Sequence, residues 1–328
     1  MKVNKKKFII FFSLLCTICF IIFIFLFLKK TVIHTIITID NNYTYPALVS
    51  MTSMLENTDK KTCFEVHVLV SDSFTDENKN KLKKIEEIYK NCKISFVCME
   101  NEFSNAPLEK HFTVASYYRL AIPKLFPDLK RCIYLDVDTI ILKDLTNLAN
   151  INIGKNYIGA AADAVRAEPQ QDKKENYREF LGIPNLDQCI NSGVLLWNLD
   201  ECRKDTITEK FKAFIESKND EKIPSVDQSV IDAVCYGKIL TLPFKFNVQT
   251  YLYFSGKQYG EDDYSAKICN EKEWNEAWND PFIIHYAGDK PWKASIKFEE
   301  KWWEYAQKTP CWDAIKEEYK TAYNKFQG

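Results

Sequence analysis

Residues 132–138 read Cys-Ile-Tyr-Leu-Asp-Val-Asp, an apolar run that ends in two aspartates one residue apart. The run is typical of a buried strand, and in an open α/β sheet the ligand crevice lies at the carboxyl ends of the strands. Two carboxylates in this position can turn toward one hard divalent cation, and Mg²⁺ or Mn²⁺ bound in this way bridges diphosphate oxygens. The same tripeptide also fits a strand-end turn with two solvated acids, so the surrounding sequence has to decide.

The chain before these aspartates alternates between predicted strands and helices. Apolar alternation and helical spacing predict strands at 35–39, 64–70, 94–97 and 133–135 and helical segments at 46–55, 82–88 and 115–120. Strands that alternate with helices of this length indicate right-handed βαβ units. The expected fold class is therefore α/β with a mainly parallel central sheet.

Beyond Asp138 the alternation is looser. Further strands are predicted at 157–162, 194–198, 239–242 and 282–285. Residues 251–280 form a long irregular stretch, and loops of that size are usually functional lids or insertions. No internal repeat or low-complexity linker is visible, so residues 31–328 are expected to form one domain.

The first thirty residues differ from the rest of the chain. Four lysines within residues 2–7 precede an apolar run at 8–28, which Lys29 and Lys30 close. About 20 apolar residues span a bilayer core, and no small-residue cleavage site follows, as a cleaved signal peptide would require. The pattern predicts an N-terminal transmembrane helix in residues 1–30 and a single-pass membrane protein. The heavier lysine cluster favours a cytoplasmic N-terminus, but the side of the membrane on which residues 31–328 lie stays open.

Composition excludes some classes of partner. Lys and Arg (44) nearly balance Asp and Glu (45), and no basic stripe runs through the chain, so no nucleic acid partner is expected. The eleven cysteines are scattered and odd in number, which does not indicate a disulfide framework. Small molecules are the expected partners.

A second residue of the kind that binds metals stands far downstream. His285 ends the apolar run 282–284 and is followed closely by Gly288 and Lys290. Imidazole suits Mn²⁺ better than Mg²⁺, so two acids and one histidine make a plausible site that leaves positions for a diphosphate. Gly288 would let the backbone approach phosphate, and Lys290 would supply a cation. The alternative for His285 is a core histidine at a strand end, which is also our expectation for His67.

With these residues assembled, the chain from residue 36 to about residue 315 resembles glycosyltransferase family 8, which includes lipopolysaccharide galactosyl- and glucosyltransferases and glycogenin. The matching segments follow in the family's order: Ile39-Asp40-Asn41-Asn42-Tyr43, Ser116-Tyr117-Tyr118-Arg119-Leu120, Asp136-Val137-Asp138, Gly159-Ala160-Ala161-Ala162-Asp163, Asn191-Ser192-Gly193-Val194, Asp227-Gln228 and the residues from His285 to Lys290. The resemblance implies a single GT-A-type domain with a Rossmann-like central sheet. It also implies an Mn²⁺- or Mg²⁺-dependent hexosyltransferase that uses UDP-galactose or UDP-glucose.

The resemblance further implies which residues bind the donor and the metal. Asp40 and Asn42 would meet uracil and ribose, and the ring of Tyr43 would stack on the base. The metal would be held by Asp136, Asp138 and His285. Other donor contacts would come from Thr38, Arg119, Val137, Asn191, Gly288 and Lys290. Only Asp289 separates Gly288 from Lys290, whereas some members of the family have two intervening residues, and this departure shortens the loop.

Three residues are implied in catalysis. Asp163 would hold hydroxyls of the donor sugar, and Asp227 and Gln228 would lie under the anomeric carbon. A neutral amide is a poor nucleophile, so we expect retention by front-face attack, with the departing phosphate accepting the proton of a saccharide or glycolipid acceptor. Asp40 could instead form a simple Asx turn, and Asp227 could cap a helix.

Two rival functions stay open at this point. Residues 135–139, Leu-Asp-Val-Asp-Thr, also fit the nucleophile element of a haloacid-dehalogenase-like phosphatase. About four strand and helix elements precede it here, however, and no later Gly-Asp-x-x-x-Asp pair completes that family's magnesium site. The other rival is a non-catalytic protein that binds UDP-sugars on the same fold.

Overall fold

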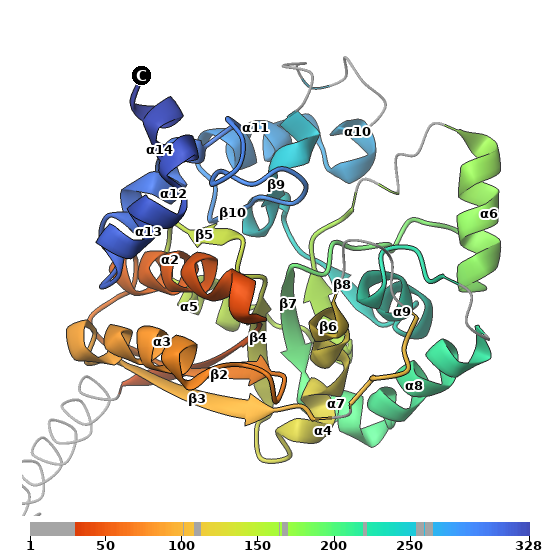
Figure 1. Ribbon diagram of the computed structural model, residues 1–328. Coiled ribbons are helices and arrows are strands. Elements are labelled where there is room, and N and C mark those ends of the chain that lie inside the picture. Colours follow the sequence, from red (N-terminus) through yellow and green to blue (C-terminus); the bar gives the residue numbers. More distant parts are fainter. Residues whose placement is uncertain are drawn as a thin grey trace, which may run out of the picture.

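The computed structural model describes residues 30–100, 102–107, 113–163, 165, 170–218, 222–253, 259 and 265–328. Its centre is a seven-stranded sheet in the order β3-β2-β1-β4-β7-β6-β8 (Figure 1). The strands are β1 (Thr31–Thr38), β2 (Thr62–Val70), β3 (Cys92–Cys98), β4 (Arg131–Leu135), β6 (Ile158–Ala160), β7 (Val194–Asn198) and β8 (Ile239–Thr241). Four of the six neighbouring pairs are parallel, and β7 runs against both of its neighbours. The predicted α/β class with a mainly parallel sheet is confirmed.

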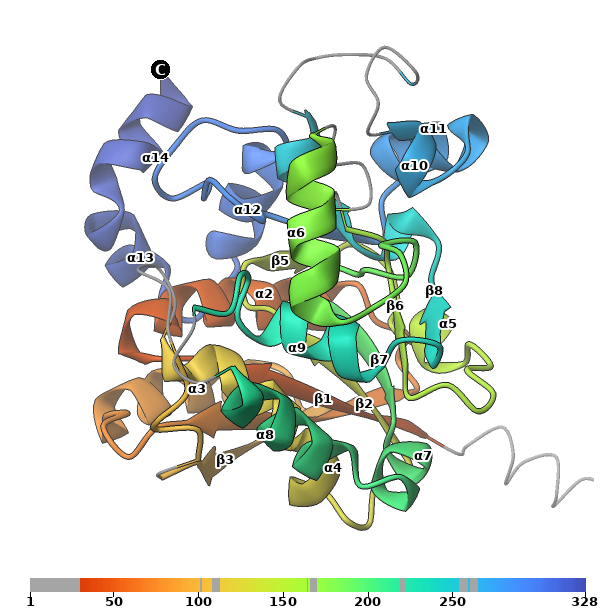
Figure 2. The ribbon, with the colours of Figure 1, turned by 90° about the vertical axis from the view of Figure 1, so that its right-hand side faces the viewer.

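Helices cover both faces of this sheet (Figures 1 and 2). Along β4, Ile133 and Leu135 pack into one core, while Cys132 and Tyr134 pack into the other. The first core also holds α2 (Thr44–Glu56), α3 (Asp76–Ile88), α12 (Glu299–Ala306) and α13 (Trp312–Glu318). The second holds η2 (Val114–Ala121), α4 (Ile122–Leu125), α7 (Leu199–Lys204), α8 (Ile207–Ser217) and α9 (Asp227–Val234). A strand buried on both faces reads as a continuous apolar run, as β4 does.

A second, three-stranded sheet was not expected from the sequence. It has the order β5-β10-β9 and consists of β5 (Thr139–Ile141), β10 (Ile283–His285) and β9 (Val248–Gln249). β5 begins directly after Asp138, and the antiparallel register places His285 opposite Thr139. This pairing brings the distant histidine to the two aspartates.

The remaining helices are short or lie at the periphery. They are η1 (Asn41–Tyr43), α5 (Thr146–Ala149), α6 (Gln171–Leu181), η4 (Phe244–Phe246), η5 (Thr250–Tyr253), α10 (Ser265–Ile268), α11 (Glu271–Asn279) and α14 (Lys320–Gln327). The expectation of a long irregular stretch at 251–280 is wrong for α11, because Trp274 packs face to face on Phe244 with ring centroids 5.3 Å apart. Burial of one aromatic face is enough to hold this short helix.

The predictions of a transmembrane helix and a single-pass membrane location are corrected by the structure. In the part of the chain that the structure describes, no helix has the length and apolar character needed to cross a bilayer. The longest helices there, α2 and α3, have 13 residues each, whereas a span needs about 20. Residues 1–29, on which the predicted anchor rested, lie outside the described residues.

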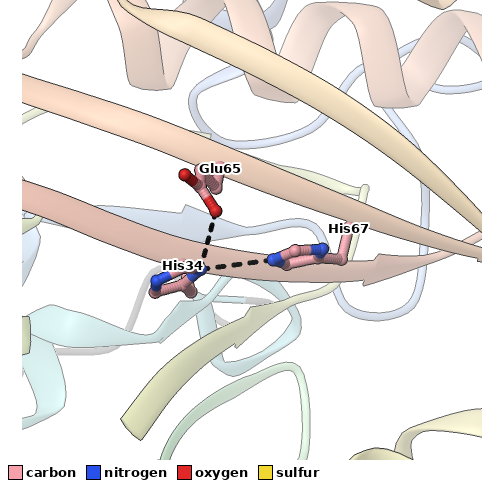
Figure 3. Close-up of side chains that lie close together, drawn as sticks. All are labelled: His34, Glu65 and His67. Carbon is pink, nitrogen blue, oxygen red and sulfur yellow. Dashed lines mark hydrogen bonds and ion pairs between the residues drawn. The ribbon is translucent and has the colours of Figure 1, made fainter. Parts of the chain in front are cut away.

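The histidine expected in the core, His67, is only half-buried. It lies on β2 beside His34 of β1, with their rings nearly parallel and the centroids 5.6 Å apart. Glu65, two residues before His67 on the same strand, contacts His34 (Figure 3). Three polar side chains thus share one patch of the sheet surface.

Candidate active site

A cavity of about 690 Å³ lies where the carboxyl ends of β1, β4 and β10 meet. Of the residues predicted to form the site, all but Asn42 line it: Thr38, Asp40, Tyr43, Arg119, Asp136, Val137, Asp138, Asp163, Asn191, Asp227, Gln228, His285, Gly288 and Lys290. Asn42 is exposed. The backbone N–H of Asn42 donates to Oδ1 of Asp40 at 2.9 Å, so the Asx turn considered for Asp40 is present beside the cavity.

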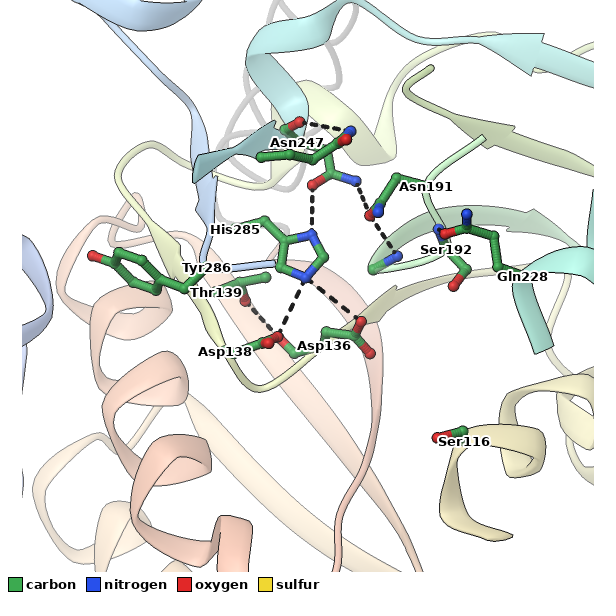
Figure 4. A network of polar contacts seen from close by, with 12 residues as sticks. Ser116, Asp136, Asp138, Thr139, Asn191, Ser192, Gln228, Asn247, His285 and Tyr286 are labelled. Carbon is green, nitrogen blue, oxygen red and sulfur yellow. Dashed lines mark hydrogen bonds and ion pairs between the residues drawn. The ribbon is translucent and has the colours of Figure 1, made fainter. Parts of the chain in front are cut away.

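Asp136, Asp138 and His285 form a compact cluster, called here the cavity cluster (Figure 4). Nε2 of His285 is 3.4 Å from Oδ1 of Asp138 and 3.7 Å from Oδ2 of Asp136. Two carboxylates and one imidazole that converge in this way are a donor set suited to a divalent cation such as Mn²⁺. The residues present therefore fit a metal ion.

A chain of hydrogen bonds determines the tautomer of His285. The backbone N–H of Gly193 donates to Oδ1 of Asn191, which must therefore accept, so the second hydrogen bond to this oxygen comes from the amide NH₂ of Asn247. The amide oxygen of Asn247 then faces Nδ1 of His285 at 3.0 Å. Nδ1 carries the proton, and the lone pair of Nε2 points at the two carboxylates, as a metal ligand requires.

Basic residues flank the cavity cluster on two sides. Nη2 of Arg119 is 3.0 Å from Oδ1 of Asp136, and Nζ of Lys290 is 2.5 Å from Oδ2 of Asp138. Burial alone would raise the pKa of Asp138, but the ammonium group of Lys290 holds it well below its usual range. Burial opposes the charge on Lys290 as well, yet Asp138 raises the pKa of that ammonium group. Both members of this pair are therefore charged at neutral pH.

Gly193 lies directly beneath the cavity cluster. A Cβ atom at this position would be 2.2 Å from Cε1 of His285 and 2.9 Å from Oδ2 of Asp136. Those separations are far below van der Waals contact, so any side chain would displace two of the three cluster residues. The sequence showed Gly193 only as part of a segment that matches the family, and it gave no sign of this role.

Asp227 and Gln228 begin α9 at the opposite wall of the cavity. Asp227 is buried and lies 3.1 Å from Nε of Arg119. Burial raises the pKa of Asp227 to about 6, although Arg119 opposes this shift. Oε1 of Gln228 accepts the backbone N–H of Ser192 at 3.1 Å. Just before this pair, Val226 has φ of 42°, a region that β-branched residues rarely adopt.

Asp163 lies between the two walls. Its Oδ2 accepts from the hydroxyl of Tyr251 at 3.1 Å and from the amide of Asn191 at 3.3 Å. Burial raises the pKa of Asp163, while these donors favour its ionised form. Sequence reasoning missed Tyr251 and Asn247, because a single tyrosine and a single asparagine outside any motif carry no visible signal.

The comparisons with known proteins agree with this geometry. Residues 34–295 match Glycosyl transferase family 8. The chain is 27% identical over 294 residues to General stress protein A of Bacillus subtilis (strain 168), covering 88% of this chain and 97% of that protein. It is 28% identical over 280 residues to a lipopolysaccharide 1,2-glucosyltransferase of Escherichia coli (strain K12), covering 84% and 77%. A solved structure of the galactosyltransferase LgtC with donor and acceptor sugar analogues has the same fold, with a TM-score of 0.68, 22% identity and coverage of 85% and 96%.

Proposed function

This chain is a member of glycosyltransferase family 8, and we propose that it moves a hexose, galactose or glucose, from a UDP-sugar to a saccharide or glycolipid acceptor with retention of configuration and with the help of Mn²⁺ or Mg²⁺. Residues 31–328 would form its one catalytic domain. The observation that carries the proposal is the convergence of Asp136, Asp138 and His285 on the cavity that Gln228 also lines. Because the chain belongs to glycosyltransferase family 8, we no longer consider the haloacid-dehalogenase-like phosphatase.

The charge of the cavity supports dependence on a metal. Five carboxylates line it against two side chains with permanent positive charge: Asp40, Asp136, Asp138, Asp163 and Asp227 face Arg119 and Lys290. A UDP-sugar carries a negative diphosphate, which such a cavity would repel by itself. A divalent cation held by Asp136, Asp138 and His285 would offset the carboxylates and supply positive charge for the diphosphate. Donor binding is therefore expected to be weak without the cation.

The nucleotide would bind at the end of β1, against Thr38, Asp40 and Tyr43. The ring of Tyr43 meets Trp292 edge to face, with centroids 6.3 Å apart, which limits its rotation. Burial raises the pKa of Tyr43, so its phenol stays neutral. A neutral aromatic ring held in place suits stacking on a pyrimidine, and we expect UDP to bind more tightly than ADP or GDP.

The sugar would lie between Asp163, Asn191 and the start of α9. The oxygen of the Gln228 amide already accepts a hydrogen bond from Ser192, so it is poorly placed to attack the anomeric carbon. We assign Gln228 and Asp227 to stabilising and orienting the sugar. The acceptor would then attack from the face that the phosphate leaves, and the phosphate would take its proton.

A second cavity of about 560 Å³ is the proposed place for the acceptor. It shares Asp163, Ser225 and Gln228 with the donor cavity and extends along α6, past Lys173 and Tyr177. Polar and aromatic side chains together suit a saccharide, which offers hydroxyls on its edges and C–H groups on its faces.

The test measures release of UDP from UDP-galactose and UDP-glucose by the purified chain, across a panel of saccharide and glycolipid acceptors, with Mn²⁺ or with excess EDTA. Proton NMR then gives the linkage of the first glycoside formed. We expect metal-dependent release and an α-linked glycoside. A β-linked product would overturn the assignment of retention. Tight UDP-sugar binding without any turnover, across a panel of acceptors, would favour the non-catalytic alternative.

A further inference from the structure

A second cluster of potential metal ligands lies away from the cavity, on the surface of the sheet (Figure 3). It consists of His34 on β1 and Glu65 and His67 on β2, called here the strand cluster. The parallel register sets His34 opposite Glu65, and strand alternation turns His67 to the same face. Two of the chain's four histidines are gathered here, and one potential ligand atom from each residue lies within 4.8 Å of the others.

The distances in the strand cluster match the edges of a coordination tetrahedron. Nδ1 of His34 is 3.3 Å from Nε2 of His67 and 3.4 Å from Oε2 of Glu65. Zinc bonds of about 2.0–2.1 Å give ligand-to-ligand edges of about 3.3–3.4 Å in a tetrahedron. Without an ion, the two ring nitrogens face each other directly and form a hydrogen bond, which a bound ion would replace after a small rotation of the rings.

The surroundings of His67 also prepare it as a ligand. The hydroxyl of Ser95 on β3 donates to the carbonyl of Val66 at 3.5 Å, so its oxygen can accept from Nδ1–H of His67 at 2.9 Å. This arrangement leaves Nε2 unprotonated and directed at His34. The ring of Phe126 packs against His67 with centroids 4.7 Å apart and shields one side. A hydrogen-bonded partner behind a ligating histidine is a regular feature of metal sites.

We propose that His34, Glu65 and His67 bind one Zn²⁺ ion, separate from the ion of the cavity cluster, with water as the fourth ligand. The side chain of Glu65 is 46% exposed, which leaves room for that water. Two imidazoles and one carboxylate prefer Zn²⁺ to Mn²⁺, whereas the cavity cluster has the opposite ratio of ligands. An ion that bridges β1 and β2 and binds only the folded chain stabilises the fold by mass action.

The experiment measures Zn²⁺ binding by calorimetry in chains that carry His285→Gln, so that the cavity cluster is disabled. We expect one bound Zn²⁺ per chain and a melting temperature that rises with Zn²⁺ concentration. Adding His67→Gln or His34→Gln should abolish binding, and adding Ser95→Ala should weaken it by about 10–100-fold.

Circular dichroism checks that each variant is folded. Glu65→Gln is a conservative variant, because Glu65 is half-buried and glutamine has nearly the same shape, so the packing stays the same. It should weaken Zn²⁺ binding without changing the spectrum. Failure of the folded His285→Gln chain to bind Zn²⁺ would overturn the proposal, as would equal binding after loss of either strand-cluster histidine. Transfer by the wild-type chain with Mn²⁺ is a separate readout, which does not depend on this site.

Discussion

The cavity cluster and the strand cluster each bring together three side chains, but they are built in different ways. Asp136, Asp138 and His285 come from two sheets, and His285 follows Asp136 by almost half the chain. His34, Glu65 and His67 come from two adjacent strands of one sheet. The first set is mostly carboxylate, with two half-buried aspartates and a buried histidine, and the second is mostly imidazole, with all three residues half-buried. The same number of ligands can therefore serve different ions when donor type and access differ.

Their supporting contacts differ as well. His285 is oriented through Asn247 and Asn191 back to a backbone N–H, whereas His67 is oriented by one serine on the neighbouring strand. Two basic residues, Arg119 and Lys290, contact the carboxylates of the cavity cluster. Loss of a single contact should therefore have wider effects in the cavity cluster.

The largest effect is expected from Asp138→Ala. Removal of one carboxylate takes away a metal ligand and leaves Lys290 without its ion-pair partner. A metal clamp contributes several kcal/mol to catalysis, so kcat should fall by about 10³–10⁴-fold. Steady-state kinetics with Mn²⁺ measures this fall. Zn²⁺ binding at the strand cluster should not change, and a loss at both clusters would mean that they are not independent.

The second prediction concerns pH and uses Asp227. Its pKa is raised from 3.8 to about 6 in the folded chain, so the folded state holds this proton more tightly than the unfolded state. The resulting stability is fully present below about pH 4 and is lost as the pH rises through about 6. Asparagine does not titrate. The free energy of unfolding of Asp227→Asn, relative to that of wild type, should therefore rise by about 2–3 kcal/mol from pH 4 to pH 7.

Urea unfolding in EDTA at several pH values checks this difference. Asp136 contributes to the raised pKa of Asp227, so Mn²⁺ beside Asp136 should move the step to lower pH, while Zn²⁺ on the strand cluster should not. A difference between the two chains that is independent of pH would contradict the assignment.

The third-largest effect is expected from Gly193→Ala. The added methyl group would push against His285 and Asp136, as described above, and a misplacement of about 1 Å in an active site costs about 10²-fold in rate. Affinity for Mn²⁺ should fall with it. Gly154→Ala is a matched control, because that glycine has no atom within 4 Å of the added Cβ. Gly154 has a positive φ, which alanine adopts with strain, so the free energies of unfolding of both variants are measured in parallel.

The smallest effects are expected from the residues that orient the two histidines. Asn247→Leu removes the acceptor for Nδ1 of His285, and Ser95→Ala removes the acceptor for Nδ1 of His67. Each should weaken binding of its own ion by about 10–100-fold and leave the other unchanged. Titrations with Mn²⁺ and Zn²⁺ on both variants test this. Equal weakening of both ions by either change would remove the distinction between the clusters.

The elements that could be predicted from sequence are those with a long regular pattern. Buried and half-buried residues alternate along the first seven positions of β2, and β4 is apolar from Cys132 to Leu135. β5 and β9 have three and two residues, too few for any period to be recognised. Because these short strands could not be predicted, His285 was a candidate ligand only through its place at the end of an apolar run and through the family resemblance. The hydrogen-bond chain through Asn247 was beyond reach, because burial of a polar residue depends on tertiary packing.

Within the candidate site, two neighbouring asparagines show the same limit. The resemblance assigned Asn42 to the nucleotide; this residue is exposed and does not line the cavity, and Asn41 bonds to the backbone of Ser73 and Thr75 in a following loop. A shift of one residue in a 3-10 turn such as η1 rotates a side chain by about 120°. Motif matching does not resolve such a rotation.

The pairing of β5 with β10 also sets an order of events during protein synthesis. The strand cluster and its serine are complete once residue 95 has emerged from the ribosome, whereas the cavity cluster waits for residue 285. At about 5–20 residues per second, these two moments are on the order of ten seconds or more apart. A nascent chain could therefore acquire its zinc long before it can hold its catalytic ion. Translation itself would keep the enzyme silent until nearly the whole domain has been made.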